Sequence, residues 1–212
     1  MVAVVGGGIA VAIAVNHSDG APGLSPLRAG IVAAAQGQVG YRTDPSDTYC
    51  NKFSAYWNAG TDDCGNGNLD EEWCADFAAW AWKQAGALVS YQLAPGYLNA
   101  DSASFYVWGT NHGTWHPVGS GYVAQPGDVA VYGLDTTAVT AVHVAVVIGD
   151  GGNNAAPDVV NGDGDRTGYS VVEVGDHQAY ADVKGKGAPL SGYVSPSPAP
   201  SPAPSSGSSA AS

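Results

Sequence analysis

Apolar and polar positions alternate with a helical period along residues 68–86. Two neighbouring rows of mostly apolar side chains recur there at intervals of three or four residues: Trp73, Phe77, Trp80 and Gln84, and Cys74, Ala78, Ala81 and Ala85. Such a period predicts one helix with a wide apolar face. We expect Asn68 or Asp70 to cap its start, with Asn68 and Glu71 forming a capping box, and Gly86 to end it.

Shorter segments predict the other elements. Helices are expected at residues 27–38 and 102–108, and strands at 129–132, 141–148, 158–161 and 169–174. Residues 40–67 and 109–121 are expected to be loops. Short turns between the strands favour antiparallel pairing. Helices precede strands along the chain, which predicts an α+β fold with N-terminal helices packed on a small antiparallel sheet.

The two ends of the chain lack the pattern of a folded core. Residues 1–15 are almost wholly apolar but lack a preceding Lys or Arg, so we interpret them as a degraded or mis-started export signal. The alternative is a cytoplasmic N-terminal extension. Residues 16–26 are expected to be a mobile linker, and the uncharged Pro, Ser, Ala and Gly of residues 195–212 a disordered tail. Residues 27–194 then form one domain.

Charge limits the partners of this domain. The 212 residues include 7 Lys and Arg against 19 Asp and Glu, a net charge of −12. Such an acidic chain is unsuited to nucleic acid and to an anionic membrane surface. The apolar N-terminal segment is also short for a membrane span, so we expect no membrane insertion of the mature domain, and a monomer.

Three cysteines bear on the compartment. Cys50 and Cys64 flank a polar loop, which in an exported protein favours a disulfide; the alternatives are a Cys64–Cys74 bond or three reduced thiols. With the first pairing, Cys74 is left as a free thiol. The cysteines lack the Cys-x-x-Cys spacing of a zinc site. Two acidic pairs, Asp44 with Asp47 and Asp62 with Asp63, lack the pattern of a calcium loop. We therefore expect neither a metal nor a cofactor.

Candidate chemistry centres on Cys74, in the first turn of the expected helix. Unpaired N–H groups and the helix dipole favour a thiolate there, whereas three nearby acids oppose it: Glu71, Glu72 and Asp76. A reactive thiol therefore needs a cationic partner. His143 in one strand and Asn161 at the end of the next complete a Cys-His-Asn arrangement. The alternative is that Cys74 and His143 are core residues.

Several stretches together are similar to a known family. They are Glu-Glu-Trp-Cys-Ala-Asp-Phe (71–77), Pro-Gly-Asp-Val-Ala-Val-Tyr (126–132), His-Val-Ala-Val-Val-Ile-Gly (143–149) and Val-Val-Asn-Gly-Asp (159–163). The chain resembles CHAP domains, which are cysteine, histidine-dependent amidohydrolases/peptidases of the papain-like superfamily. Residues 50–57 and 113–116 are similar to actinobacterial members. The resemblance covers residues 27–174 and implies a papain-like fold.

The resemblance also implies a secreted or wall-associated peptidoglycan hydrolase that cleaves a muramyl–peptide amide or a peptide cross-link. It matches Cys74 with the nucleophile, His143 with the base and Asn161 with the orienting residue. Many family members carry Glu at the third position, and Asp163 is the alternative orienter here. Three tryptophans are expected to contact the peptidoglycan or its stem peptides: Trp73, Trp108 and Trp115.

Two other functions remain open. One is a non-catalytic wall-binding or adhesion module on the same fold, for which replacing Cys74 by Ala would change nothing. The other is a cysteine peptidase that acts on proteins.

Overall fold

The structure, a computed structural model, describes residues 23–149, 157–164, 171–176, 179–180 and 188–200. Its helices are α1 (Pro26–Gln36), α2 (Lys52–Trp57), α3 (Cys74–Gln84) and α4 (Ala103–His112). The strands are β1 (Cys50–Asn51), β2 (Leu69–Asp70), β3 (Trp115–Pro117), β4 (Val129–Tyr132), β5 (His143–Gly149), β6 (Asp158–Gly164), β7 (Val171–Asp176), β8 (Ala179–Tyr180) and β9 (Ala188–Val194). The expected export signal, most of the linker and residues 201–212 lie outside the described residues.

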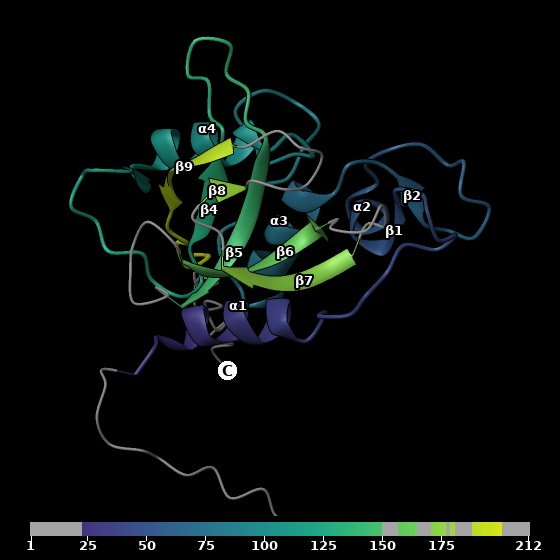
Figure 1. Ribbon diagram of the computed structural model, residues 1–212, viewed down its shortest axis with the longest axis horizontal. Coiled ribbons are helices and arrows are strands. Elements are labelled where there is room, and N and C mark those ends of the chain that lie inside the picture. Colours follow the sequence, from purple (N-terminus) through teal and green to yellow (C-terminus); the bar gives the residue numbers. More distant parts are fainter. Residues whose placement is uncertain (1–22, 150–156, 165–170, 177–178, 181–187, 201–212) are drawn as a thin grey trace, which may run out of the picture.

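An antiparallel sheet forms one layer, and the N-terminal helices form the other. Within the described residues the strand order is β3-β9-β4-β5-β6-β7, with β8 also paired to β9. Helix α3 packs against β5 and β6, and α1 packs against α3 and β5, as Figure 1 shows. The expected α+β fold, with helices packed on an antiparallel sheet, is confirmed. No described helix has the length and apolarity that crossing a membrane requires.

Both faces of the central sheet are buried, because successive side chains of a strand point to opposite faces. One set joins α3 in the main core: Val129, Val131, Val144, Val146 and Val160. The alternate set forms a second core cluster: Ala130, Tyr132, Ala145, Val147 and Val159. Strands β4 and β5 therefore read as continuous apolar runs in the sequence.

Helix α3 is buried on nearly all sides, rather than on the single face that its pattern predicts. Its small residues let the sheet and the other helices approach closely: Ala75, Ala78, Ala79 and Ala81 are fully buried. The large side chains Phe77 and Trp82 fill the space on either side of them. The side chains that reach solvent gather at its C-terminal end.

The start of α3 differs from the expected one. Leu69 and Asp70 form β2, which pairs with β1, so the capping box at Asn68 is wrong. Trp73 is the N-cap and makes no side-chain capping bond, and Cys74 is the first helical residue. Gly86 ends the helix with a φ of +84°, as predicted. Pairing with a distant strand thus decided where the helix begins.

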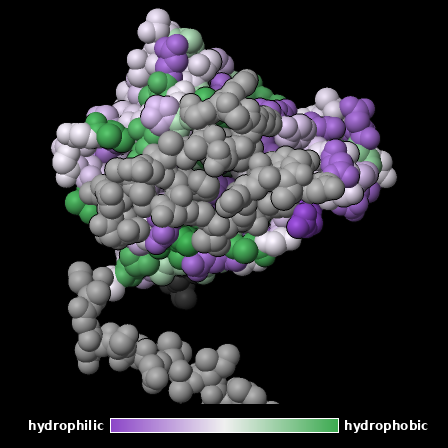
Figure 2. All heavy atoms as spheres, in the orientation of Figure 1, coloured by the Kyte–Doolittle hydropathy of each residue, from purple (hydrophilic) through white to green (hydrophobic). Residues whose placement is uncertain are grey.

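The segment expected as a loop at residues 40–67 contains ordered elements. Asn51 caps α2 by accepting hydrogen bonds from the N–H groups of Phe53 and Ser54, and Cys50 is bonded to Cys64. The predicted disulfide is therefore confirmed and its alternatives are excluded. Figure 2 shows hydrophilic side chains gathered on the lobe that carries α2, β1 and β2.

The C-terminal part of the chain adds a strand that the sequence analysis missed. Strand β9 lies between β3 and β4, and residues 109–121 supply the end of α4 and the whole of β3 instead of a loop. The described chain continues beyond the expected boundary at Ser195. The Leu88 N–H donates to Ser197 O at 2.7 Å, and the Ala199 N–H donates to Gly86 O at 3.1 Å.

Candidate active site

Cys74 is the free cysteine of the described residues, and its thiol lies at the first turn of α3. The N–H of a first helical residue has no partner inside the helix, so the Cys74 N–H is available to an incoming group. The sulfur lies 3.1 Å from Ser102 Oγ and accepts a hydrogen bond from the Val144 N–H. The residue is 6% exposed, so the thiol is almost enclosed by its partners.

The Cys74 sulfur accepts a hydrogen bond from β5 at a position where β6 would otherwise supply the acceptor. The register between β5 and β6 begins at Val146 and Val160, although β5 itself starts at His143. Successive N–H groups of a strand point to opposite neighbours. The Val147 N–H donates on the β4 side, so the Val144 N–H points toward β6, where it meets the sulfur. Cys74 Sγ therefore lies where β5 and β6 separate.

His143 of β5 and Asn161 of β6 are hydrogen-bonded at the same place, where the two strands separate. His143 Nε2 lies 2.9 Å from Asn161 Oδ1, and both side chains are buried. The structure thus brings the three expected residues to one end of the β5–β6 pair. The hydrogen bond reaches Asn161, the orienter that was expected ahead of Asp163.

This hydrogen bond assigns the histidine tautomer. An amide oxygen only accepts, so His143 Nε2 must carry the proton that is shared with Asn161 Oδ1. In the neutral ring, Nδ1 then carries the lone pair and is the nitrogen able to receive a proton. Asn161 Nδ2 is buried and has no partner among the described residues.

The resting thiol is protonated. Burial raises the pKa of Cys74 to about 12, and Asp163 adds to the increase, while the hydrogen bonds from Ser102 and the Val144 N–H act against it. Asp76 contributes a smaller increase. Burial opposes the thiolate that the helix terminus favours, so a reactive thiol still needs the cationic partner that the sequence analysis calls for. The Asp163 carboxylate, distant in sequence, matters more than the expected acids Glu71 and Glu72.

A pocket of about 360 Å³ lies beside the segment that carries Ser102, although Cys74, His143 and Asn161 are not among its lining residues. One wall consists of residues 93–104 and α4, and the other is Val139, in the turn that leads to His143. Its lining is mostly apolar and includes Leu93, Pro95, Tyr97, Val107 and Val139, with three polar side chains, Asn99, Asp101 and Ser104. Asp101 and Ala103 line the pocket and flank Ser102, so the pocket borders the segment that reaches the sulfur.

Of the three tryptophans expected to contact substrate, Trp73 and Trp108 are packing residues. Trp73 is fully buried and stacks on Phe53 at a centroid distance of 5.3 Å. Trp108 is 5% exposed and stacks on His112 at 3.8 Å. Trp115 is half-buried against Tyr106. Trp73 and Trp108 offer no ring face to a ligand, which corrects the expectation for both.

Two partners of the sulfur were missed by sequence reasoning. Ser102 lies 28 residues from Cys74, in a segment without a motif, and Val144 acts through its backbone. Ser102 carries no sequence signal. For Val144 the only available signal is its position next to His143, which suggests that its N–H reaches the site. Within the described ranges, no cluster of three or more His, Cys, Asp or Glu side chains suits a metal ion.

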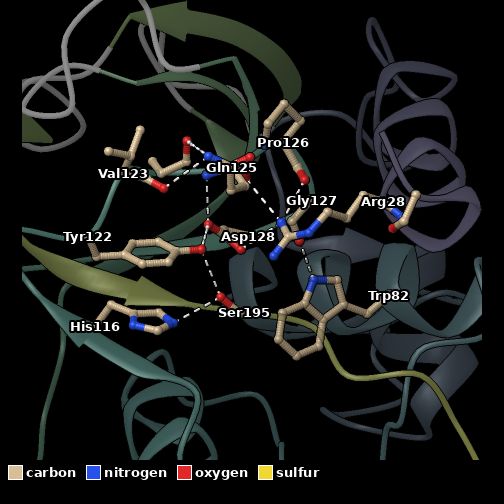
Figure 3. A network of polar contacts seen from close by, with 12 residues as sticks. Arg28, Trp82, His116, Tyr122, Val123, Gln125, Pro126, Gly127, Asp128 and Ser195 are labelled. Atoms are coloured by element: carbon tan, nitrogen blue, oxygen red, sulfur yellow. Dashed lines mark hydrogen bonds and ion pairs between the residues drawn. The ribbon is translucent and has the colours of Figure 1, made fainter. Parts of the chain in front are cut away.

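A second polar network lies elsewhere and joins a serine to a histidine (Figure 3). Asp128 accepts from Tyr122 OH and from Arg28, each at 2.8 Å. The Tyr122 proton is therefore committed to Asp128, and the Tyr122 oxygen accepts from Ser195 Oγ at 2.9 Å. Ser195 Oγ in turn accepts from His116 Nε2 at 3.0 Å. His116 is the donor in this chain of bonds, so it does not activate Ser195 as a nucleophile.

Comparison with known proteins gives limited similarity. No protein-family model matches the chain, and no curated protein matches it. The solved structure of NlpC2 from Trichomonas vaginalis is 14% identical with a TM-score of 0.44, over 84% of this chain and 48% of that chain. NlpC1 from Trichomonas vaginalis is 13% identical with a TM-score of 0.43, over 78% and 42%. The chain spans about half the length of these structures.

Proposed function

We propose that the chain is a CHAP-type cysteine amidohydrolase that cleaves an amide bond of peptidoglycan, either at the muramyl–peptide junction or in a peptide cross-link. The observation that carries the proposal is the convergence of Cys74, His143 and Asn161 where β5 and β6 separate. The sulfur is bound to the N–H of the residue after His143, and the ring is held by Asn161. A core cysteine would need neither partner.

In this mechanism the thiol loses its proton as it attacks. His143 Nδ1 accepts the thiol proton while Sγ bonds to the amide carbonyl carbon, and the developing oxyanion accepts from the Cys74 N–H. His143 then gives the proton to the leaving amine, and the C–N bond breaks to leave a thioester. Water, deprotonated by His143, hydrolyses the thioester and regenerates the thiol. Asn161 keeps the imidazole in the tautomer that this sequence of steps needs.

The proposed substrate is a peptide stem of the wall, held in the pocket beside Ser102. The mostly apolar lining of that pocket, with Asp101 at one side, suits a peptide that carries short apolar side chains. The Cys50–Cys64 disulfide is consistent with an extracellular protein, which is where the proposed substrate lies.

The test is digestion of purified peptidoglycan by the wild-type chain and by variants, with the released ends identified by mass spectrometry. We expect Cys74→Ser to abolish release and His143→Ala to reduce it at least about 100-fold, as loss of a general base does. His112→Ala is the matched control, since His112 is exposed and bonds to Trp108 O at 2.8 Å. New amino ends in cross-links would identify an endopeptidase, and free lactyl ends an amidase.

A non-catalytic wall-binding module is the second candidate, and the enclosed, protonated thiol favours it. This function predicts that Cys74→Ala binds insoluble peptidoglycan as wild type does and that neither protein releases fragments. Release that persists in Cys74→Ser would contradict both candidates. Cleavage of casein, but not of peptidoglycan, would instead support a peptidase with protein substrates.

A further inference from the structure

We propose that Ser102 is a further catalytic residue, whose hydroxyl donates a hydrogen bond to the Cys74 sulfur as the thiolate forms. This inference rests on the proposed function, because it assigns a role within the same site. It adds a side chain that no sequence motif identifies and that reaches the reacting atom itself.

Geometry supports direct contact. Ser102 Oγ lies 3.1 Å from Cys74 Sγ, and Ser102 is 7% exposed, so water does not compete freely for either group. Either atom of this contact can donate, and the backbone N–H of Val144 donates to the sulfur beside it. A hydroxyl rotates freely, so it donates to a thiolate and accepts from a thiol without moving its oxygen.

The electrostatics of the site favour such a donor. A thiolate formed at Sγ is desolvated and is repelled by the negative charge of Asp163, and both effects oppose its ionisation. Hydrogen bonds to a charged group are stronger than those between neutral groups. Two donors, one from the backbone and one from Ser102, thus offset part of the cost of ionising the sulfur.

The backbone around Ser102 holds the hydroxyl in place. Asp101 Oδ1 accepts from the Ala103 N–H at 2.9 Å, and Asn99 Oδ1 accepts from the Asp101 N–H at 2.9 Å. Ser102 is the residue before α4, and its neighbours on both sides line the pocket. A substrate in that pocket therefore lies beside the segment that positions the hydroxyl.

The experiment measures alkylation of Cys74 by iodoacetamide from pH 6 to 9 in wild type and in Ser102→Ala. Loss of one hydrogen bond lowers the thiolate fraction about 10- to 100-fold. The more basic thiolate is more nucleophilic, with a Brønsted coefficient of about 0.4–0.5, so the expected decrease in rate is about three- to tenfold at every pH. Removing the hydroxyl also opens access to the sulfur, which alone would raise the rate, so steric and electronic effects have opposite signs.

Thr43→Val is the matched control. Thr43 is buried to a similar degree, and it is neither a hydrogen-bond partner of the sulfur nor part of the pocket lining, so the alkylation rate of this variant should equal that of wild type. A second comparison serves if Ser102→Ala loses the circular dichroism spectrum of the folded protein. The variants Ser102→Thr and Ser102→Val have side chains of nearly equal shape, and only the threonine carries a hydroxyl. Threonine should alkylate three- to tenfold faster than valine.

Equal rates in Ser102→Ala and wild type, or equal rates in the Thr and Val variants, would overturn the proposal. Alkylation forms no oxyanion. If Ser102→Ala slows peptidoglycan hydrolysis but not alkylation, the hydroxyl acts on the carbonyl oxygen of the substrate and not on the sulfur, which would also overturn the proposal. Because the assay needs no wall substrate, a wild type that fails to digest peptidoglycan would count against the proposed function and leave this comparison intact.

Discussion

Asp76 is a buried carboxyl group two residues beyond Cys74. It accepts a hydrogen bond from Ser54 Oγ at 2.6 Å and another from Tyr91 OH. Burial raises its pKa to about 6, and these two hydrogen bonds offset only part of the increase. The carboxyl group therefore joins α2, α3 and the segment before the pocket at an electrostatic cost.

That cost predicts an unusual dependence of stability on pH. A carboxyl whose folded pKa exceeds its unfolded value of 3.8 holds its proton more tightly when folded. Its contribution is fully present below about pH 4 and is lost as pH rises through 6, a change of about 3 kcal/mol. Urea denaturation at pH 4, 5, 6 and 7 should show this slope in wild type and not in Asp76→Asn. An identical slope in both proteins would assign it to other groups.

At the scale of elements, the contact of β6 with α3 sets the position of Asn161. Gly162 lies against Phe77, and a Cβ at Gly162 would lie 2.5 Å from Phe77 Cβ. No side chain fits there without moving the strand away from the helix. The glycine thus permits the close approach that keeps the neighbouring Asn161 within hydrogen-bond distance of His143.

Gly162→Ala should therefore damage stability and site together. Overpacking of this kind costs about 1–3 kcal/mol, and the displaced Asn161 should lower hydrolytic activity further than the loss of folded protein explains. Urea denaturation and peptidoglycan turnover on the same preparations separate the two effects. Gly23→Ala is the control, since nothing lies within 4 Å of the added Cβ. Wild-type activity in Gly162→Ala would mean that the site tolerates a shifted β6.

At the scale of the whole molecule, one buried ion pair joins the two layers. Arg28 of α1 and Asp128, just before β4, lie 2.8 Å apart, and the Asp128 side chain is fully buried. The same arginine donates to Pro126 O at 2.8 Å, and Trp82 Nε1 of α3 donates to Gly127 O at 2.9 Å. The turn before β4 is thus held by both α1 and α3.

Removing one charge of this pair should destabilise the fold. Arg28→Met leaves Asp128 buried without its cation, which costs about 3 kcal/mol in comparable pairs. The midpoint of urea denaturation at pH 7 should fall accordingly, whereas the exposed Arg42→Met should change stability by less than about 0.5 kcal/mol. If Arg28→Met and Arg42→Met unfold at the same urea concentration, the pair does not join the layers energetically.

Elements with a strong local pattern were predictable, and those without one were not. The apolar run of β4 follows from the sequence, and the helix expected at residues 27–38 forms as α1, with bounds shifted by one residue at its start and two at its end. Helix α2 is only six residues long, within a composition typical of loops, and β9 contains Pro189 and Gly192, which disrupt the pattern of a strand. Both elements form because distant segments supply their partners.

The sequence by itself determined the α+β order, the central helix and the identity of the three candidate catalytic residues, because these depend on near neighbours in the chain and on motif spacing. Only the tertiary structure decided that Cys74 opens α3, that its thiol rests protonated and that Ser102 and the Val144 N–H meet the sulfur. Burial and hydrogen bonding depend on segments that are far apart in the chain. No local pattern carries that information, and it is there that the chemistry of the thiol is determined.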